Sequence, residues 1–156
     1  GDVYKRQGLS SFYDEFQKRQ SGRDSRRHFL LLFFDEWASY ILNLDKKKAE
    51  DEKRKLASLL MLGRSFNVHV LISQQRVDAS YFNAARDNFN LVIALGNLSE
   101  EGKEMMFREF KDQMKPDRKQ GTGYMLTNGT DFIPVLVPSI SNMERLHHYI
   151  KQAVTR

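Results

Sequence analysis

Cysteine is absent from this chain of 156 residues. Its absence excludes a disulfide framework, a thiol nucleophile and a cysteine-based zinc site. The four histidines do not stand at metal-ligand spacing from a second strong ligand, so the sequence gives no reason to expect bound zinc. A reducing, cytosolic setting fits this composition.

Long apolar runs are also missing. The longest, residues 29–34, has the length of a strand, far below the roughly 20 residues that cross a bilayer. The N-terminus does not have the pattern of a secretory signal peptide. We therefore expect no membrane-spanning segment within these residues.

The chain also lacks a large excess of one charge. It contains 25 Lys and Arg and 20 Asp and Glu, which gives a net charge of +5. A mildly basic balance permits contact with DNA or anionic lipid without requiring either. Two lysine-rich clusters, residues 46–48 and 53–55, are candidate DNA contacts. Their alternative is the solvated face of a helix with many ion pairs.

The chain begins with Gly1 rather than Met, and residues 1–7 read GDVYKRQ. We interpret this stretch as a non-native tail on a fragment. The remaining residues, 8–156, have the length of one domain or a large piece of one.

Apolar residues are present in patterns that alternate between helix and strand. Leu9, Phe12 and Phe16 lie on one helical face, and Ser11 with Asp14 resembles the start of a helix. Continuous apolar runs at residues 29–34, 68–72 and 91–95 predict strands that are buried on both faces. The expected fold class is therefore α/β, with a mostly parallel sheet flanked by helices.

The last third of the chain predicts a different arrangement. Ser99 is expected to cap a helix, and two strands, residues 124–126 and 132–137, flank the hairpin signal Asn128-Gly129. Ser141 and a Glu three residues later predict the start of a final helix. The sheet should therefore end in a C-terminal β-hairpin.

Two adjacent acids, Asp35 and Glu36, follow the first apolar run directly. An apolar strand ending in two acids is the Walker B pattern. Ligands of open parallel sheets bind at the carboxyl ends of the strands. An acid there can reach a nucleotide-bound Mg²⁺ through water, and the next acid can polarise the attacking water. The alternative is an ordinary strand end that leads into a helix.

A polar amide, Gln75, follows the second apolar run. A Gln in this place can bond the attacking water or the terminal phosphate, or it can simply cap the strand. Arg64, Arg76 and Arg86 stand in loops near predicted strand ends. Each is a candidate for the arginine that ATPase rings supply to a neighbouring site, or an ordinary surface arginine.

A phosphate-binding loop is missing, because no Gly-Lys is followed by Ser or Thr. The Walker A strand, loop and helix should then lie upstream of Gly1. We expect residues 1–156 alone to be inactive in ATP hydrolysis.

The order of these motifs resembles the second half of the FtsK/SpoIIIE motor domain, a RecA-like P-loop NTPase, across residues 29–139. The likeness rests on four segments: FLLLFFDEWASYI, GRSFNVHVLISQQRVD, NAARDNFNLVIALG and GTGYMLTNGTDFIPVLVP. Gln74 and Val77 depart from the family's usual Thr and Pro, and Val92 stands where many members have Arg. The variant is most similar to FtsK-like proteins of Gram-positive conjugative elements.

The resemblance implies ATP and Mg²⁺ as cofactors. It makes Asp35 the Mg²⁺-site acid acting through water, Glu36 the catalytic base and Gln75 the sensor. All three would contact the nucleotide. Arg86 is the first choice for the arginine that acts on the neighbouring subunit.

The resemblance also implies partners and a location. They are DNA gripped through its backbone without sequence preference, a homo-oligomeric ring that is hexameric in such motors, and the cytoplasmic face of a membrane. The membrane would be reached only through an N-terminal portion outside these residues. Two alternatives stay open: a type VII secretion-like ATPase that moves protein, and a structural relic of the fold that no longer hydrolyses ATP.

Overall fold

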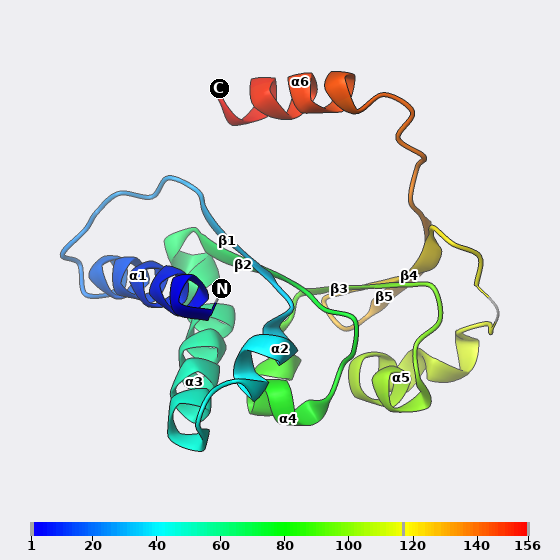
Figure 1. Ribbon diagram of the computed structural model, residues 1–156, viewed down its shortest axis with the longest axis horizontal. Coiled ribbons are helices and arrows are strands. Elements are labelled where there is room, and N and C mark those ends of the chain that lie inside the picture. Colours follow the sequence, from blue (N-terminus) through cyan, green and yellow to red (C-terminus); the bar gives the residue numbers. More distant parts are fainter. Residues whose placement is uncertain (1, 117, 156) are drawn as a thin grey trace.

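The computed structural model describes residues 2–116 and 118–155. Figure 1 shows the chain as short sheets with helices gathered mainly on one side. In chain order the elements are α1 (Asp2–Gln20), β1 (Leu30–Asp35), α2 (Trp37–Leu42), α3 (Lys46–Leu62), η1 (Gly63–Phe66), β2 (Val68–Ser73), α4 (Ala79–Phe82), η2 (Asn83–Asn88), β3 (Leu91–Leu95), α5 (Glu100–Phe107), η3 (Arg108–Gln113), β4 (Thr122–Thr127), β5 (Asp131–Leu136) and α6 (Met143–Val154).

The strands form two sheets rather than one. Strands β1 and β2 are parallel and in register from Leu30 opposite Val68 to Asp35 opposite Ser73. Strands β3, β4 and β5 form a separate antiparallel sheet. The α/β class is confirmed, but the mostly parallel sheet is wrong for the described residues. An apolar run reveals that a strand is buried but not which strand it pairs with.

The first core joins α1, α2 and α3 to the parallel pair. Trp37 and Tyr40 are fully buried, as are Phe16 of α1 and Leu56 of α3. Trp37 Nε1 donates a hydrogen bond to the carbonyl oxygen of Tyr81, 2.8 Å away. This bond ties the start of α2, directly after the acid pair, to α4.

A second, smaller core packs α5 and η3 against the antiparallel sheet. Phe107 and Tyr124 are buried there, and the ring of Phe132 stacks 4.9 Å from that of Tyr124 and 5.0 Å from that of Phe110. Phe107 meets Phe132 edge-on. The β4–β5 hairpin is therefore held by aromatic side chains from both strands and the helical segment.

Each sheet buries only one face. In β1, Phe34 is 4% exposed whereas Phe33 is 58% exposed. Leu71 of β2 and Ile93 of β3 are likewise about half exposed, at 51% and 53%. Successive strand residues point to opposite faces, and the helices of the described chain pack on only one of them. The predicted burial of both faces is therefore wrong for the described residues.

Two expected helix starts are also wrong. Helix α1 begins at Asp2 and runs through Ser11, so the capping pattern at Ser11 lies inside a helix. The N-cap of α6 is Asn142, whose side chain accepts a hydrogen bond from the Arg145 N–H, rather than Ser141. A capping pattern marks a helix start only where the preceding residues leave helical geometry. That residues 1–7 are non-native stays a prediction.

Two other local predictions are confirmed. The side chain of Ser99 accepts a hydrogen bond from the Gly102 N–H and caps α5. Asn128 and Gly129 both have left-handed backbone, with φ of 52° and 73°. Two such residues in a row suit the tight turn of a two-stranded hairpin.

Candidate active site

The predicted Mg²⁺-site acid, Asp35, is the last residue of β1, and its side chain is exposed at the carboxyl end of the strand. The parallel register sets it directly opposite Ser73, the last residue of β2. The Ser73 hydroxyl donates a hydrogen bond to Asp35 Oδ1. The two strand ends are therefore joined through side chains as well as through the backbone.

The predicted catalytic base, Glu36, has a left-handed backbone, with φ 55° and ψ 59°. For a residue with a side chain this conformation costs about 1–2 kcal/mol. Its N–H donates to the Ser73 carbonyl oxygen at 2.8 Å, and its own carbonyl oxygen accepts from the Tyr40 N–H at 3.3 Å. The strand-to-helix turn that carries the two acids thus contains one residue with unfavourable backbone geometry.

The two neighbouring glutamines after β2 lie in different environments. Gln75, the predicted sensor, is exposed. Both amide atoms of Gln74 are buried, and neither has a hydrogen-bond partner within the described chain. A buried amide without a partner is costly, so this side chain suits a place where a polar group arrives from outside. Sequence reasoning treated Gln74 only as a departure from the family pattern.

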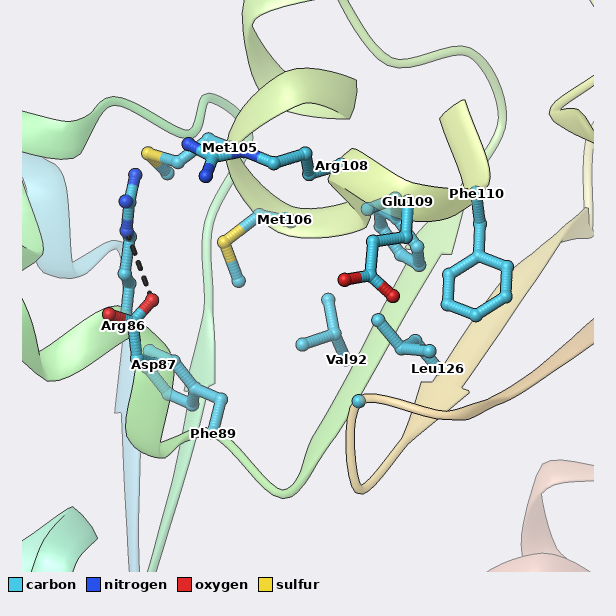
Figure 2. Close-up of a pocket in the computed structure, with 12 residues that line it drawn as sticks. Arg86, Asp87, Phe89, Val92, Met105, Met106, Arg108, Glu109, Phe110 and Leu126 are labelled. Atoms are coloured by element: carbon cyan, nitrogen blue, oxygen red, sulfur yellow. Dashed lines mark hydrogen bonds and ion pairs between the residues drawn. The ribbon is translucent and has the colours of Figure 1, made fainter. Parts of the chain in front are cut away.

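Arg86 lies in η2, where its Nε is 3.2 Å from Asp87 Oδ1. Figure 2 shows Arg86 at the edge of a cavity of about 290 Å³ whose lining includes Val92, Met106 and Leu126. Arg86 also borders a second cavity of about 610 Å³, which is lined mainly by charged residues. Asp35, Glu36 and Gln75 line neither cavity, so Arg86 shares no cavity with them among those described.

The remaining candidate arginines are exposed: Arg64 in η1 and Arg76 directly after Gln75.

Asp78, two residues after Arg76 in the sequence, borders the larger cavity. The backbone N–H of Ser80 donates to Asp78 Oδ1 at 2.8 Å and holds the pKa of Asp78 below its usual value. Asp78 is therefore a carboxylate at neutral pH.

Lysines from both clusters form ion pairs with acids of α3 or with its N-cap, Asp45. Lys48 lies 2.7 Å from Asp45, Lys53 lies 2.8 Å from Glu50, and Lys55 also pairs with acids on the same helix. Lys53 is mostly buried. These contacts support the reading of a helix face with many ion pairs, and contact with DNA stays a prediction.

The residues at the strand ends fit a nucleotide-bound Mg²⁺. This ion keeps most of its water and binds through one or two carboxylates together with substrate phosphates. Asp35 offers one such carboxylate, and the unpartnered Gln74 amide lies one residue beyond Ser73. In the described part of the chain, three or more His, Asp or Glu residues nowhere gather into a metal cage. The donor set therefore suits a cation that arrives with phosphate ligands.

Within residues 2–116 and 118–155, every helix is too short or too polar to cross a bilayer.

Comparison with known proteins gives one relative and one structure of note. Over 124 residues the chain is 31% identical to the "Ftsk domain-containing protein YdcQ" of Bacillus subtilis, a match that covers 75% of this chain and 26% of that protein. The chain thus spans about a quarter of its relative's length. No family model matches the chain.

The fold is similar to that of a solved structure, the cytoplasmic domain of the type VII secretion ATPase EccC from Thermomonospora curvata. The TM-score is 0.62 with 18% identity, over 86% of this chain and 18% of that one. Similarity at this identity supports the fold alone. Together with the sequence match to YdcQ, it shows that this chain belongs to the FtsK domain family.

Proposed function

We propose that this chain is the C-terminal part of a RecA-like motor domain that hydrolyses ATP to move DNA. The proposal rests on the contacts between the ends of β1 and β2. The Ser73 hydroxyl donates a hydrogen bond to Asp35, and the Ser73 carbonyl oxygen accepts one from Glu36, which has a left-handed backbone. Two acids and polar side chains at the carboxyl ends of parallel strands form the half of a nucleotide site that handles the cation and the water.

Each residue has a distinct proposed role. Mg²⁺·ATP would supply the transferable phosphoryl group and the charge that stabilises it. Asp35 would hold the cation through a water, and Glu36 would accept a proton from the attacking water. Gln75 reports the state of the terminal phosphate. The buried Gln74 amide, one residue earlier, gives this segment a second polar group able to respond to the nucleotide.

The phosphate cradle has to come from another part of a longer polypeptide, because these residues contain no Gly-Lys-Ser/Thr. Two observations support this division. Among the described strands, β2 pairs only with β1 and β3 only with β4, so each sheet keeps an open edge. YdcQ is about four times as long as the matched region. By this proposal residues 1–156 alone do not hydrolyse ATP.

We propose a ring, with a hexamer as the expected size, in which Arg86 acts on the nucleotide of a neighbouring subunit. Support comes from the position of Arg86: it is half-buried and borders two cavities that neither Asp35 nor Glu36 lines. An arginine that serves another subunit has to lie away from its own site. The ring would operate at the cytoplasmic face of a membrane, anchored through another portion of the protein.

DNA is the proposed substrate because the sequence match is to an FtsK-domain protein and the motif variants resemble those of conjugative elements. A mildly basic surface allows backbone contacts that read no sequence. The second candidate substrate is protein, favoured by the similarity in fold to a secretion ATPase. The third possibility, a relic without ATP chemistry, conflicts with the paired acids and their hydrogen bonds to Ser73.

The deciding experiment measures ATP turnover by the intact protein with and without double-stranded DNA at several salt concentrations. We expect DNA of any sequence to raise turnover, and added salt to weaken this effect because backbone contacts release counterions. Arg86→Ala should abolish turnover while ATP binding persists. Turnover raised by a secreted polypeptide and not by DNA would favour the second candidate, and absence of turnover would favour the relic.

A further inference from the structure

One residue outside the predicted set, Ser73, contacts both acids of the candidate site. We infer that Ser73 is a positioning residue, which fixes the Asp35 carboxylate for the cation and the Glu36 backbone for the water. The inference rests on the proposed function, because it assigns a task within the same site. Neither the sequence pattern nor the comparisons give Ser73 a role.

The side-chain contact acts on Asp35. The Ser73 hydroxyl donates its single proton to Oδ1, and the register pairs the two residues across the ends of β1 and β2. This bond restricts the rotamers that the exposed Asp35 side chain can adopt at the strand end. A fixed Oδ1 leaves Oδ2 in one orientation, which is what a cation held through water requires.

The backbone contact acts on Glu36. The Ser73 carbonyl oxygen accepts the Glu36 N–H at 2.8 Å. On the other side of Glu36, the ring of Trp37 is completely buried and donates to the Tyr81 carbonyl oxygen. The left-handed turn at Glu36 is therefore held from both sides, by Ser73 and by Trp37.

The two contacts separate in a variant. Replacing the Ser73 side chain removes the bond to Asp35 but keeps the carbonyl that holds Glu36. The expected defect therefore lies in cation binding and not in proton abstraction. Loss of a residue that orients a metal ligand lowers metal affinity about 10- to 100-fold, so the Mg²⁺ concentration for half-maximal turnover should rise by that factor. Turnover at saturating Mg²⁺ should stay close to that of the wild type.

The test compares Ser73→Thr with Ser73→Val in the intact protein, since these side chains share one shape and differ in the hydroxyl. Ser58→Ala is the matched control, because the Ser58 hydroxyl donates to the Arg54 carbonyl oxygen within its own helix, α3. Two quantities are measured for each protein: the Mg²⁺ dependence of turnover, and the affinity for a fluorescent ATP analogue with and without Mg²⁺. The second quantity does not depend on hydrolysis.

We expect the Thr variant and the Ser58→Ala control to match the wild type. The Val variant should need about 10- to 100-fold more Mg²⁺ in both measurements. Equal Mg²⁺ dependence of the Thr and Val variants, with a wild type that hydrolyses ATP, would overturn the role of Ser73 and leave the proposed function intact. A wild type without Mg²⁺-dependent nucleotide binding would instead overturn the proposed function.

Discussion

The buried side chain of Arg19 joins three separate segments ahead of the candidate site. One guanidinium nitrogen donates to the carbonyl oxygens of His28 at 2.9 Å and Phe66 at 3.0 Å, and the other lies 3.1 Å from His28 Nε2. Its side chain is 0% exposed, and its Nε lies 3.6 Å from Glu15 Oε1. Arg19 thus ties α1 to the segment that enters β1 and to the end of η1.

Replacing Arg19 with Met keeps most of the apolar stem and removes the three donors. Two carbonyl oxygens, those of His28 and Phe66, then lose their partner. A buried polar group left unsatisfied costs about 1–3 kcal/mol. Both bonds are only partly buried, so the lower end of this cost applies to each, and we expect the free energy of unfolding to fall by about 2 kcal/mol, out of the roughly 5–15 kcal/mol that stabilises a typical domain.

Urea unfolding measured by the fluorescence of Trp37 checks this value. Trp37 is the only tryptophan of the chain and is fully buried, so its emission reports the first core. Arg54→Met is the control: that side chain is 78% exposed and pairs with Asp51 on its own helix, so its loss should change stability by no more than about 0.5 kcal/mol. A change of that small size for Arg19→Met would refute the reasoning.

Three further changes have definite expected outcomes. Gly123→Ala would press a Cβ against the Ala94 carbonyl oxygen on β3. We expect it to lower the free energy of unfolding by at least about 2 kcal/mol, measured by urea unfolding. Ser99→Ala removes the cap of α5 and should lower thermal stability by about 1 kcal/mol. Hydrogen bonds from the Arg26 side chain and backbone hold the pKa of Asp24 well below its ordinary 3.8. The stability it contributes is therefore present above pH 3.8 and lost as the pH falls below it. In Asp24→Asn, unfolding stability measured from pH 5 downward should fall less steeply than in the wild type.

The location of the candidate site could be predicted from the sequence. An apolar run that ends in Asp35 and Glu36, and a second run that ends near Gln75, specify two strand ends. Parallel strands carry their carboxyl ends to one edge of the sheet. The register of Asp35 opposite Ser73 agrees with this expectation.

The partners of the strands could not be predicted in the same way. The run at β3 has the same apolar character as β1, yet β3 pairs with β4 in an antiparallel sheet. Hydrophobicity records burial and not the neighbour that provides it. The exposed faces around Phe33 and Ile93 could not be predicted for the same reason. A continuous apolar run does not reveal whether the residues that cover each face of the strand belong to these 156 residues.

The contacts of single polar residues could not be predicted from the sequence either. Arg19 reads as the polar end of a helix, but its bond to Phe66 spans 47 positions. Ser73 reads as an ordinary strand end, and only the register reveals that its hydroxyl meets Asp35. The left-handed backbone of Glu36 has no sequence signal either, because glycine is the residue expected in that conformation.

The most direct measurement of the central claim compares ATP binding with ATP turnover for Glu36→Gln in the intact protein. Glu144→Gln, on the exposed helix α6, is the control of equal chemistry. The account predicts wild-type affinity for Mg²⁺·ATP and a turnover lowered about 10²- to 10⁴-fold for Glu36→Gln, with no change for the control. Turnover by Glu36→Gln at the wild-type rate would contradict a catalytic base at the end of β1.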